Sequence, residues 1–208
     1  MWKNSIQLIT RRQFLKMAGF GVCATGLATP LLQSCTTKDV AEFFEGLTEL
    51  ADLINDEREK KGLNRIGLSG SLMAVAIHHV MDLNSNQPHN KCGSGGNMHS
   101  WSTNKDWKGV NGKGAWEGCC YPADHSNMPC MHDKPKEIAN YPSEGYEIAH
   151  WSGGKATPQG AITSWMASTM GHKDVILNQG MWKSYKWEAL GAACGGNYAC
   201  AWFGTVKD

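Results

Sequence analysis

Apolar residues recur at helical spacing in two stretches of the first half of the chain. Between residues 39 and 60 they fall every three or four positions, which gathers them on one face of a helix. A second stretch of this kind begins near Ser69 or Ser71 and extends to about Leu83, with His79 on its apolar stripe. We therefore expect two amphipathic helices, and in the second a core histidine whose ring is hydrogen-bonded.

Two further helices are expected in the second half of the chain. The segment 156–169, "ATPQGAITSWMAST", predicts a helix with Thr157 as its N-cap and Pro158 in its first turn. The segment 170–178, "MGHKDVILN", then predicts a short helix with a buried apolar end. His172 stands at the start of this helix, where it either fills space in the core or belongs to a site.

Strands are expected around and after these helices. "GYEIAHW", residues 145–151, reads as a strand or as the edge of a helix. Two alternating runs on either side of residues 195–197 predict an antiparallel hairpin at the end of the chain. Helices first and strands last favour an α+β fold of packed layers.

The middle of the chain has another character. Residues 84–143 are rich in Gly, Asn, Ser, Lys and Pro, and they contain scattered aromatic residues and four cysteines. Such a segment is too rich in turn residues for one regular element and too aromatic for a disordered linker. We expect an insertion, about residues 90–143, that is held by disulfides. Its aromatic residues either pack in the core or form a platform for sugar rings or a peptide.

The first 34 residues have the pattern of an export signal. Paired arginines in "TRRQFLK" precede a short apolar run, which is typical of the twin-arginine route of bacteria. The run is too short to span a membrane and ends in "LLQSC", which resembles a lipobox. We expect residues 1–34 to be removed and Cys35 to carry a lipid anchor at a membrane of the cell envelope, the alternative being an ordinary thiol at Cys35.

Removal of the signal changes the charge. It takes away four basic residues and no acidic ones, which leaves 16 Lys and Arg against 19 Asp and Glu, a net charge of −3. A nucleic-acid-binding protein needs a basic face, so this class is excluded. Residues 35–208 have the length of one domain.

Six cysteines follow the lipobox, and an even number in an exported domain favours disulfides. Four lie in the insertion and are expected to staple it, and two flank the hairpin turn and could be joined across it. The alternative is a zinc site formed by the four cysteines of the insertion with His125 and His132. The disulfide candidates are Cys92, Cys119, Cys120, Cys130, Cys194 and Cys200.

Several separated segments, in order, resemble the bacterial form of the CAP superfamily, also called the SCP domain of cysteine-rich secretory and pathogenesis-related proteins. "GYEIAHW" is similar to the "GENIA" segment of that family, and "TPQGAITSWMASTMGHKDVILN" to its "TPEEVVxxWMxSPGHRxNIL" segment. The closing "YACAWFG" matches the final strand, and the two expected helices match the first two helices of the family. The resemblance implies an α-β-α sandwich with a cleft lined by two histidines and up to two acidic residues.

Carried over by position, the resemblance makes His89 and His172 the two cleft histidines. The acid is Glu147 after a local shift, or Glu144, or it is missing, because Tyr146 stands where the family has glutamate. The second acid of the eukaryotic members has no match. "GGNMHSW" adds His99 as a further cleft residue.

Two imidazoles and a carboxylate could hold a zinc-like ion with a position left open for water, so His89, His172 and Glu147 are metal candidates. The alternative is a polar cleft without an ion. The resemblance thus implies either a lipid-anchored binding protein for a lipid, glycan or peptide, or a metal-assisted hydrolase. No nucleophile motif accompanies the cleft residues.

Overall fold

The computed structural model describes residues 37–93, 95–105 and 116–208 of the 208-residue chain. The expected signal segment, residues 1–34, and the expected lipidation site Cys35 lie outside these ranges. Within them, no helix has the length and apolar character needed to cross a membrane.

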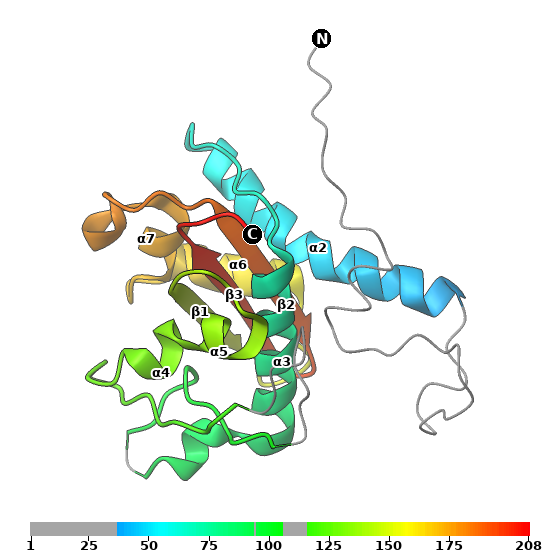
Figure 1. The fold of residues 1–208 in the computed structure, drawn as a ribbon. Helices are drawn as coiled ribbons and strands as arrows, with labels where there is room; N and C mark the ends of the chain where they lie inside the picture. The colour runs from blue at the N-terminus through cyan, green and yellow to red at the C-terminus, as the bar shows by residue number, and fades with distance from the viewer. Residues whose placement is uncertain (1–36, 94, 106–115) are drawn as a thin grey trace.

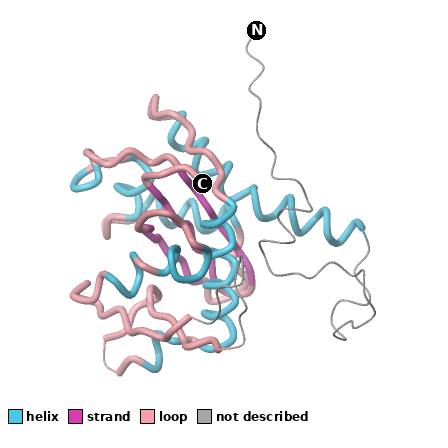
Figure 2. The backbone as a smooth tube through the Cα atoms, in the orientation of Figure 1, coloured by secondary structure: helices cyan, strands magenta, loops and turns pink. Residues whose placement is uncertain are grey.

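The centre of the fold is a three-stranded antiparallel sheet, drawn in magenta in Figure 2. Its strands are β1, Gly145–Trp151, β2, Ala189–Gly195, and β3, Tyr198–Gly204, and β3 lies between the other two. The hairpin expected at the end of the chain is β2 and β3, with Cys200 opposite Ala193. The segment that sequence left as strand or helix edge is strand β1.

Helices cover both faces of this sheet. Figure 1 shows α3, Gly70–Asn86, and α5, Lys134–Ala139, in front of it, with α6, Pro158–Ala167, behind. The rear layer also contains α2, Thr37–Glu59, and α7, His172–Leu177. The predicted α+β class and the α-β-α sandwich are therefore confirmed. Three short elements complete the order, α4, Pro129–His132, and the 3-10 helices η1, Pro88–Lys91, and η3, Gly180–Trp182.

Two helices begin directly after an N-cap, at Thr157 as predicted and at Ser69, one of the two starts left open by the sequence. Ser69 accepts a hydrogen bond at its Oγ from the Leu72 N–H over 3.0 Å, and α3 starts at the next residue. Thr157 accepts in the same way from the Gly160 N–H over 3.0 Å, with Pro158 in the first turn of α6. Each cap satisfies a backbone donor that has no partner within the helix.

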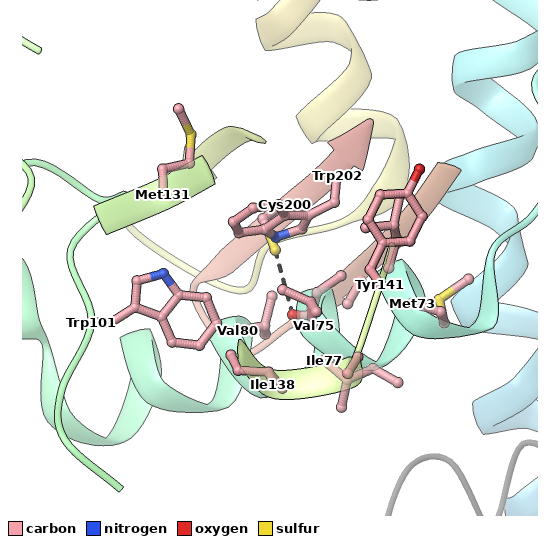
Figure 3. Packing of buried hydrophobic residues seen from close by; sticks show 14 of the residues in the cluster. Met73, Val75, Ile77, Val80, Trp101, Met131, Ile138, Tyr141, Cys200 and Trp202 are labelled. Atoms are coloured by element: carbon pink, nitrogen blue, oxygen red, sulfur yellow. Dashed lines mark hydrogen bonds between the residues drawn. The ribbon is translucent and has the colours of Figure 1, made fainter. Parts of the chain in front are cut away.

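Alternation along the strands divides the core in two. Cys200 and Trp202 point to the α3 side of β3, and Figure 3 shows them there among apolar residues. Ala201 and Phe203 point to the other side, where α2, α6 and α7 pack. Successive side chains of β1 likewise point alternately to the α3 side and to the rear layer, so the position of a polar residue along β1 determines the layer that it enters.

The front layer lies unusually close to the sheet at Gly191. A Cβ atom at this position would lie 2.1 Å from the carbonyl carbon of Leu72 and 2.2 Å from the backbone nitrogen of Met73. Only a glycine lets β2 approach the α3 backbone so closely.

Two disulfides staple the insertion, as expected. They join Cys92 to Cys120 and Cys119 to Cys130, which rules out a zinc site built from these four sulfurs. The described aromatic side chains of this segment are largely core residues rather than an open platform, since four of them are buried: Trp101, Trp116, Tyr121 and Tyr141.

The expected disulfide between Cys194 and Cys200 is wrong, because both thiols are free. Cys200 faces α3, and Cys194, one position past the residue opposite it, faces the rear layer. Their Sγ atoms therefore lie on opposite sides of the sheet. The Cys200 thiol instead donates to the carbonyl of Ala76 over 3.4 Å (Figure 3).

Candidate functional site

Glu147 is a buried acid in the middle of strand β1. Its neighbours Tyr146 and Ile148 point into the rear layer, so alternation turns Glu147 toward α3, where only 5% of the residue is exposed. Its backbone N–H lies 3.3 Å from the Met131 Sδ atom, a weak acceptor. A carboxylate in such surroundings requires hydrogen-bond partners.

Two histidines provide these partners, one for each carboxylate oxygen. The His79 Nδ1 atom lies 2.5 Å from Oε1 of Glu147, and the His99 Nδ1 atom lies 2.7 Å from Oε2. The His79 and Glu147 side chains are 0% exposed, and that of His99 is 13% exposed. Glu147 is thus clamped between two imidazoles, one in the core and one at the edge of solvent.

The charge state of Glu147 follows from this clamp. Burial opposes ionisation, but the charge and hydrogen bond of His79 and those of His99 outweigh it and lower the pKa of Glu147 below its ordinary value. Glu147 is therefore a carboxylate at neutral pH, and each imidazole donates to it.

Helix α3 and the segment after it hold the two histidines in place. His79 is on the buried face of α3, and the Trp101 ring stacks on its imidazole with 3.9 Å between centroids and 11° between planes. The backbone N–H of His99 donates to Oδ1 of Asn97 over 2.9 Å. Paired backbone hydrogen bonds between Trp101 and Cys119 fix the next part of the chain.

His172 begins helix α7 near the exposed edge of this group. It follows Gly171, whose φ of 93° belongs to the left-handed region that glycine adopts readily. Burial, followed by the charges of His99 and His150, lowers the pKa of His172. Its imidazole is therefore neutral at pH 7, partly exposed, and without a hydrogen bond to any other described side chain.

The structure sorts the other predicted site residues. Glu144 has an exposed side chain that accepts from the Tyr146 hydroxyl over 3.1 Å, so it is not the buried acid.

His89 lies apart from the acid. No hydrogen bond or ion pair among the described residues joins His89 to Glu147 or His172. The His89 ring lies beside Tyr198, 6.0 Å between centroids, and its Nδ1 is buried without a partner. Of the five predicted residues, His99 and Glu147 are hydrogen-bonded to each other, and His172 lies near enough that the charge of His99 adds to burial in lowering its pKa.

A metal at this site is limited by the number of free ligand atoms. His79, Glu147 and Cys200 offer ligand atoms within 4.8 Å of one another, a buried group that could hold an ion. Both Glu147 oxygens are, however, already hydrogen-bonded, and burial, together with Glu147, raises the pKa of Cys200 well above its ordinary value.

Toward solvent, burial and the charge of His99 lower the pKa values of both His132 and His172, so three imidazoles lie near one another here. A catalytic zinc ion takes three protein ligands. The donor set is compatible in number with such an ion.

Sequence reasoning missed the role of His79, which it predicted as a hydrogen-bonded core histidine without a named partner. That expectation is right, and the partner is the acid of the site. The signal that could have found the contact is "NMHSW", because His99, Ser100 and Trp101 all contact either Glu147 or His79.

Comparisons with known proteins find similar solved structures and no match to a family model or a curated protein. An extracellular SCP-domain protein from Bacillus anthracis is similar in structure, with a TM-score of 0.46, 15% identity, and coverage of 88% of this chain and 45% of that one. A cysteine-rich secretory protein from Staphylococcus aureus is similar with a TM-score of 0.45, 14% identity, and coverage of 79% and 40%.

This chain spans less than half the length of either solved protein. Both bear the name of the family that the sequence segments resemble. The α-β-α sandwich expected from that resemblance is the architecture of this chain.

Proposed function

We propose that this chain is an exported, lipid-anchored binding protein of the bacterial cell envelope, and that its ligand is bound by the imidazoles of His99 and His172. Helix α7 provides one histidine and the disulfide-stapled insertion provides the other. The proposal concerns a binding protein, with no chemical step assigned to the cleft.

The observation that carries this proposal is that both carboxylate oxygens of Glu147 are hydrogen-bonded, one to His79 and one to His99. With its Nδ1 atom held by the carboxylate, His99 has Nε2 as its remaining ring nitrogen. His172 adds a neutral imidazole with no described hydrogen-bond partner. Two such rings bind polar ligand groups by accepting and donating hydrogen bonds.

The two imidazoles favour a ligand with hydroxyl or amide groups, a glycan or a peptide, over a lipid chain, because imidazoles donate and accept hydrogen bonds. The Tyr121 ring packs edge-on against His99, 5.2 Å between centroids. The Tyr121 ring is itself buried, so it supports the His99 imidazole from within the core.

The hydrolase alternative is weaker on the same observation. A metal-assisted hydrolase needs a free base beside its metal. Glu147, the acid placed to serve in this role, has both oxygens engaged by His79 and His99.

Export and anchoring are supported by residues 1–35 and by the two disulfides, which are typical of proteins outside the cytosol. We expect Cys35→Ser to release the protein from the membrane fraction into the soluble one. Retention of the variant on the membrane would contradict the anchor.

Ligand binding is tested by NMR titration of the 15N-labelled protein with two probes, a chitotetraose oligosaccharide and a tetra-alanine peptide. One of them should perturb the side-chain signals of His99 and His172. We expect His99→Gln or His172→Gln to weaken its binding about tenfold, the loss of roughly one hydrogen bond. The matched control is His89→Gln, which should bind like the wild type.

Two results would contradict the proposal. The first is that neither probe shifts the cleft histidines at millimolar concentration. The second is that His89→Gln weakens binding as much as the two cleft variants, which would make the loss a general effect of removing a histidine.

A further inference from the structure

Arg58 is a buried cation of helix α2, and it is hydrogen-bonded to the helix that carries His172. We propose that Arg58 is a positioning residue, whose guanidinium fixes the carboxyl end of α7 and, through Asn178, the segment that follows, and so holds His172 at the cleft. This inference rests on the proposed function, because it assigns the support of a residue that binds the ligand.

The charge of Arg58 is held by oxygen atoms and not by an acid. Only 5% of the residue is exposed, and among the described residues no carboxylate forms an ion pair with it. Its Nη1 donates to the carbonyl oxygen of Ile176 over 2.6 Å and to Oδ1 of Asn178 over 2.7 Å, and its Nε donates to the carbonyl oxygen of Asn64 over 3.0 Å. A buried charge is costly unless it is hydrogen-bonded, so these oxygens define its place.

Two of these oxygens belong to the carboxyl end of α7. The last four carbonyl groups of a helix have no partner within the helix, and Arg58 satisfies that of Ile176. Ile176 follows His172 by four positions, which is one hydrogen-bonded turn. A group that fixes the carbonyl of Ile176 therefore fixes the turn that begins at His172.

The amino end of α7 has less support. His172 follows Gly171, whose φ is 93°, and Met170 before it is 84% exposed. The helix has only six residues, too few to be stable by themselves, and its buried residues are the last three, 175–177. The position of His172 is therefore determined from the carboxyl end of α7.

Asn178 extends the connection to strand β1. Its Oδ1 accepts from Arg58, and its Nδ2 donates to the carbonyl oxygens of Trp182, over 3.3 Å, and Tyr185, over 2.9 Å. The rings of Trp182 and Tyr185 pack on that of Tyr146, with 5.3 and 5.2 Å between centroids. Tyr146 directly precedes the buried acid of the site. Arg58 thus ties α7 to the strand that carries this acid.

Backbone 15N relaxation of the labelled protein without ligand tests the proposal. Arg58→Met keeps an apolar stem and removes every donor. The order parameter of the His172 amide should fall from about 0.85, the value of a rigid backbone, to below about 0.6, and those of Trp182 and Tyr185 should fall with it. Order parameters describe the folded molecule, so a general loss of stability leaves them unchanged.

Two matched controls should leave α7 rigid. Arg65→Met removes an exposed arginine that pairs with three acids of α2, and Ile54→Val weakens the buried face of α2 without removing a hydrogen bond to α7. Arg58→Lys serves if Arg58→Met does not fold. A lysine cannot replace the bonds of Nε and Nη1 together, so the His172 order parameter should still fall by about 0.1 or more.

A rigid α7 in both Arg58 variants, or an equal loss of order in either control, would overturn the proposal. Because these measurements need no ligand, their outcome is independent of the binding of chitotetraose or the peptide. A rigid α7 in Arg58→Met together with a bound probe would reject the role of Arg58 and keep the proposed function. A mobile α7 with neither probe bound would do the reverse.

Discussion

Glu147 and His79 are 68 positions apart in the sequence and meet through a 2.5 Å hydrogen bond in a region closed to solvent. The bond connects strand β1 to helix α3, so it belongs to the core as much as to the cleft. Stability and site chemistry are therefore coupled at this pair, and the first prediction follows from that coupling.

Glu147→Gln should lower the free energy of unfolding by about 1 to 3 kcal/mol at pH 7, because an amide cannot accept the buried hydrogen bonds of both His79 and His99. Urea unfolding followed by circular dichroism measures this loss. The control is Glu144→Gln, whose exposed side chain should matter by less than about 0.5 kcal/mol. Equal stability of the two variants would contradict a stabilising role for the buried hydrogen bonds of Glu147.

Acid should destabilise the protein in two stages. Burial lowers the pKa of His78 to about 4, from 6.5 for an ordinary histidine. Between pH 6.5 and 4, His78 is therefore protonated in the unfolded chain and neutral in the folded chain. Stability from this group is complete above pH 6.5 and is lost as the pH falls toward 4, by about 3 kcal/mol.

Glu147 contributes the second stage. Its pKa lies below the ordinary 4.5, so its contribution to stability is present above that pH and disappears as the pH falls through the lower folded value.

Urea midpoints at pH 7, 5.5 and 4.5 test the His78 stage, and they should decline less steeply in His78→Gln than in the wild type. Parallel slopes would show that His78 is accessible to protons in the folded state.

Gly191→Ala should be among the most destabilising substitutions in the chain, at about 3 kcal/mol or more. The new methyl group would overlap the backbone of α3 at Leu72 and Met73, and a backbone cannot rotate away as a side chain does. Thermal unfolding measures the effect. The control is Gly154→Ala, where a Cβ atom meets nothing within 4 Å. A mild effect at Gly191 would mean that β2 and α3 are packed less closely.

The cysteines should separate into two classes under alkylation. Burial raises the pKa of Cys194 to about 11, so this partly exposed thiol should react slowly with iodoacetamide at pH 8. Cys200 should react only after unfolding. Mass spectrometry of unreduced peptides should recover the pairs Cys92–Cys120 and Cys119–Cys130. A linked Cys194–Cys200 peptide would contradict the sheet register.

Much of the fold could be predicted from local patterns. The caps at Ser69 and Thr157 and the turn at residues 195–197 act over a few residues, and each was read from neighbouring letters. The disulfide between Cys194 and Cys200 was wrongly expected for a related reason. Closeness along a hairpin was taken for closeness of side chains, whereas alternation turns the two thiols to opposite faces.

The site was harder to predict because its residues meet only through the tertiary structure. His79, His99 and Glu147 come from a helix, a loop and a strand, and no periodicity links them. Position in a family pattern indicated His89 as the first cleft histidine, and the structure brings His99 to Glu147 instead. The insertion between helix and strand carries His99, so its course had to be known first.

The two neighbouring cysteines of the insertion show how this arrangement can tolerate damage. Cys120 is exposed and bonded to Cys92, while Cys119 is turned inward and bonded to the buried Cys130. A reductant therefore meets the outer bridge first, and the inner bridge still tethers the chain beside His99. Reduction of Cys92–Cys120 therefore leaves Cys119–Cys130 in place, because the adjacent side chains of Cys119 and Cys120 point in opposite directions.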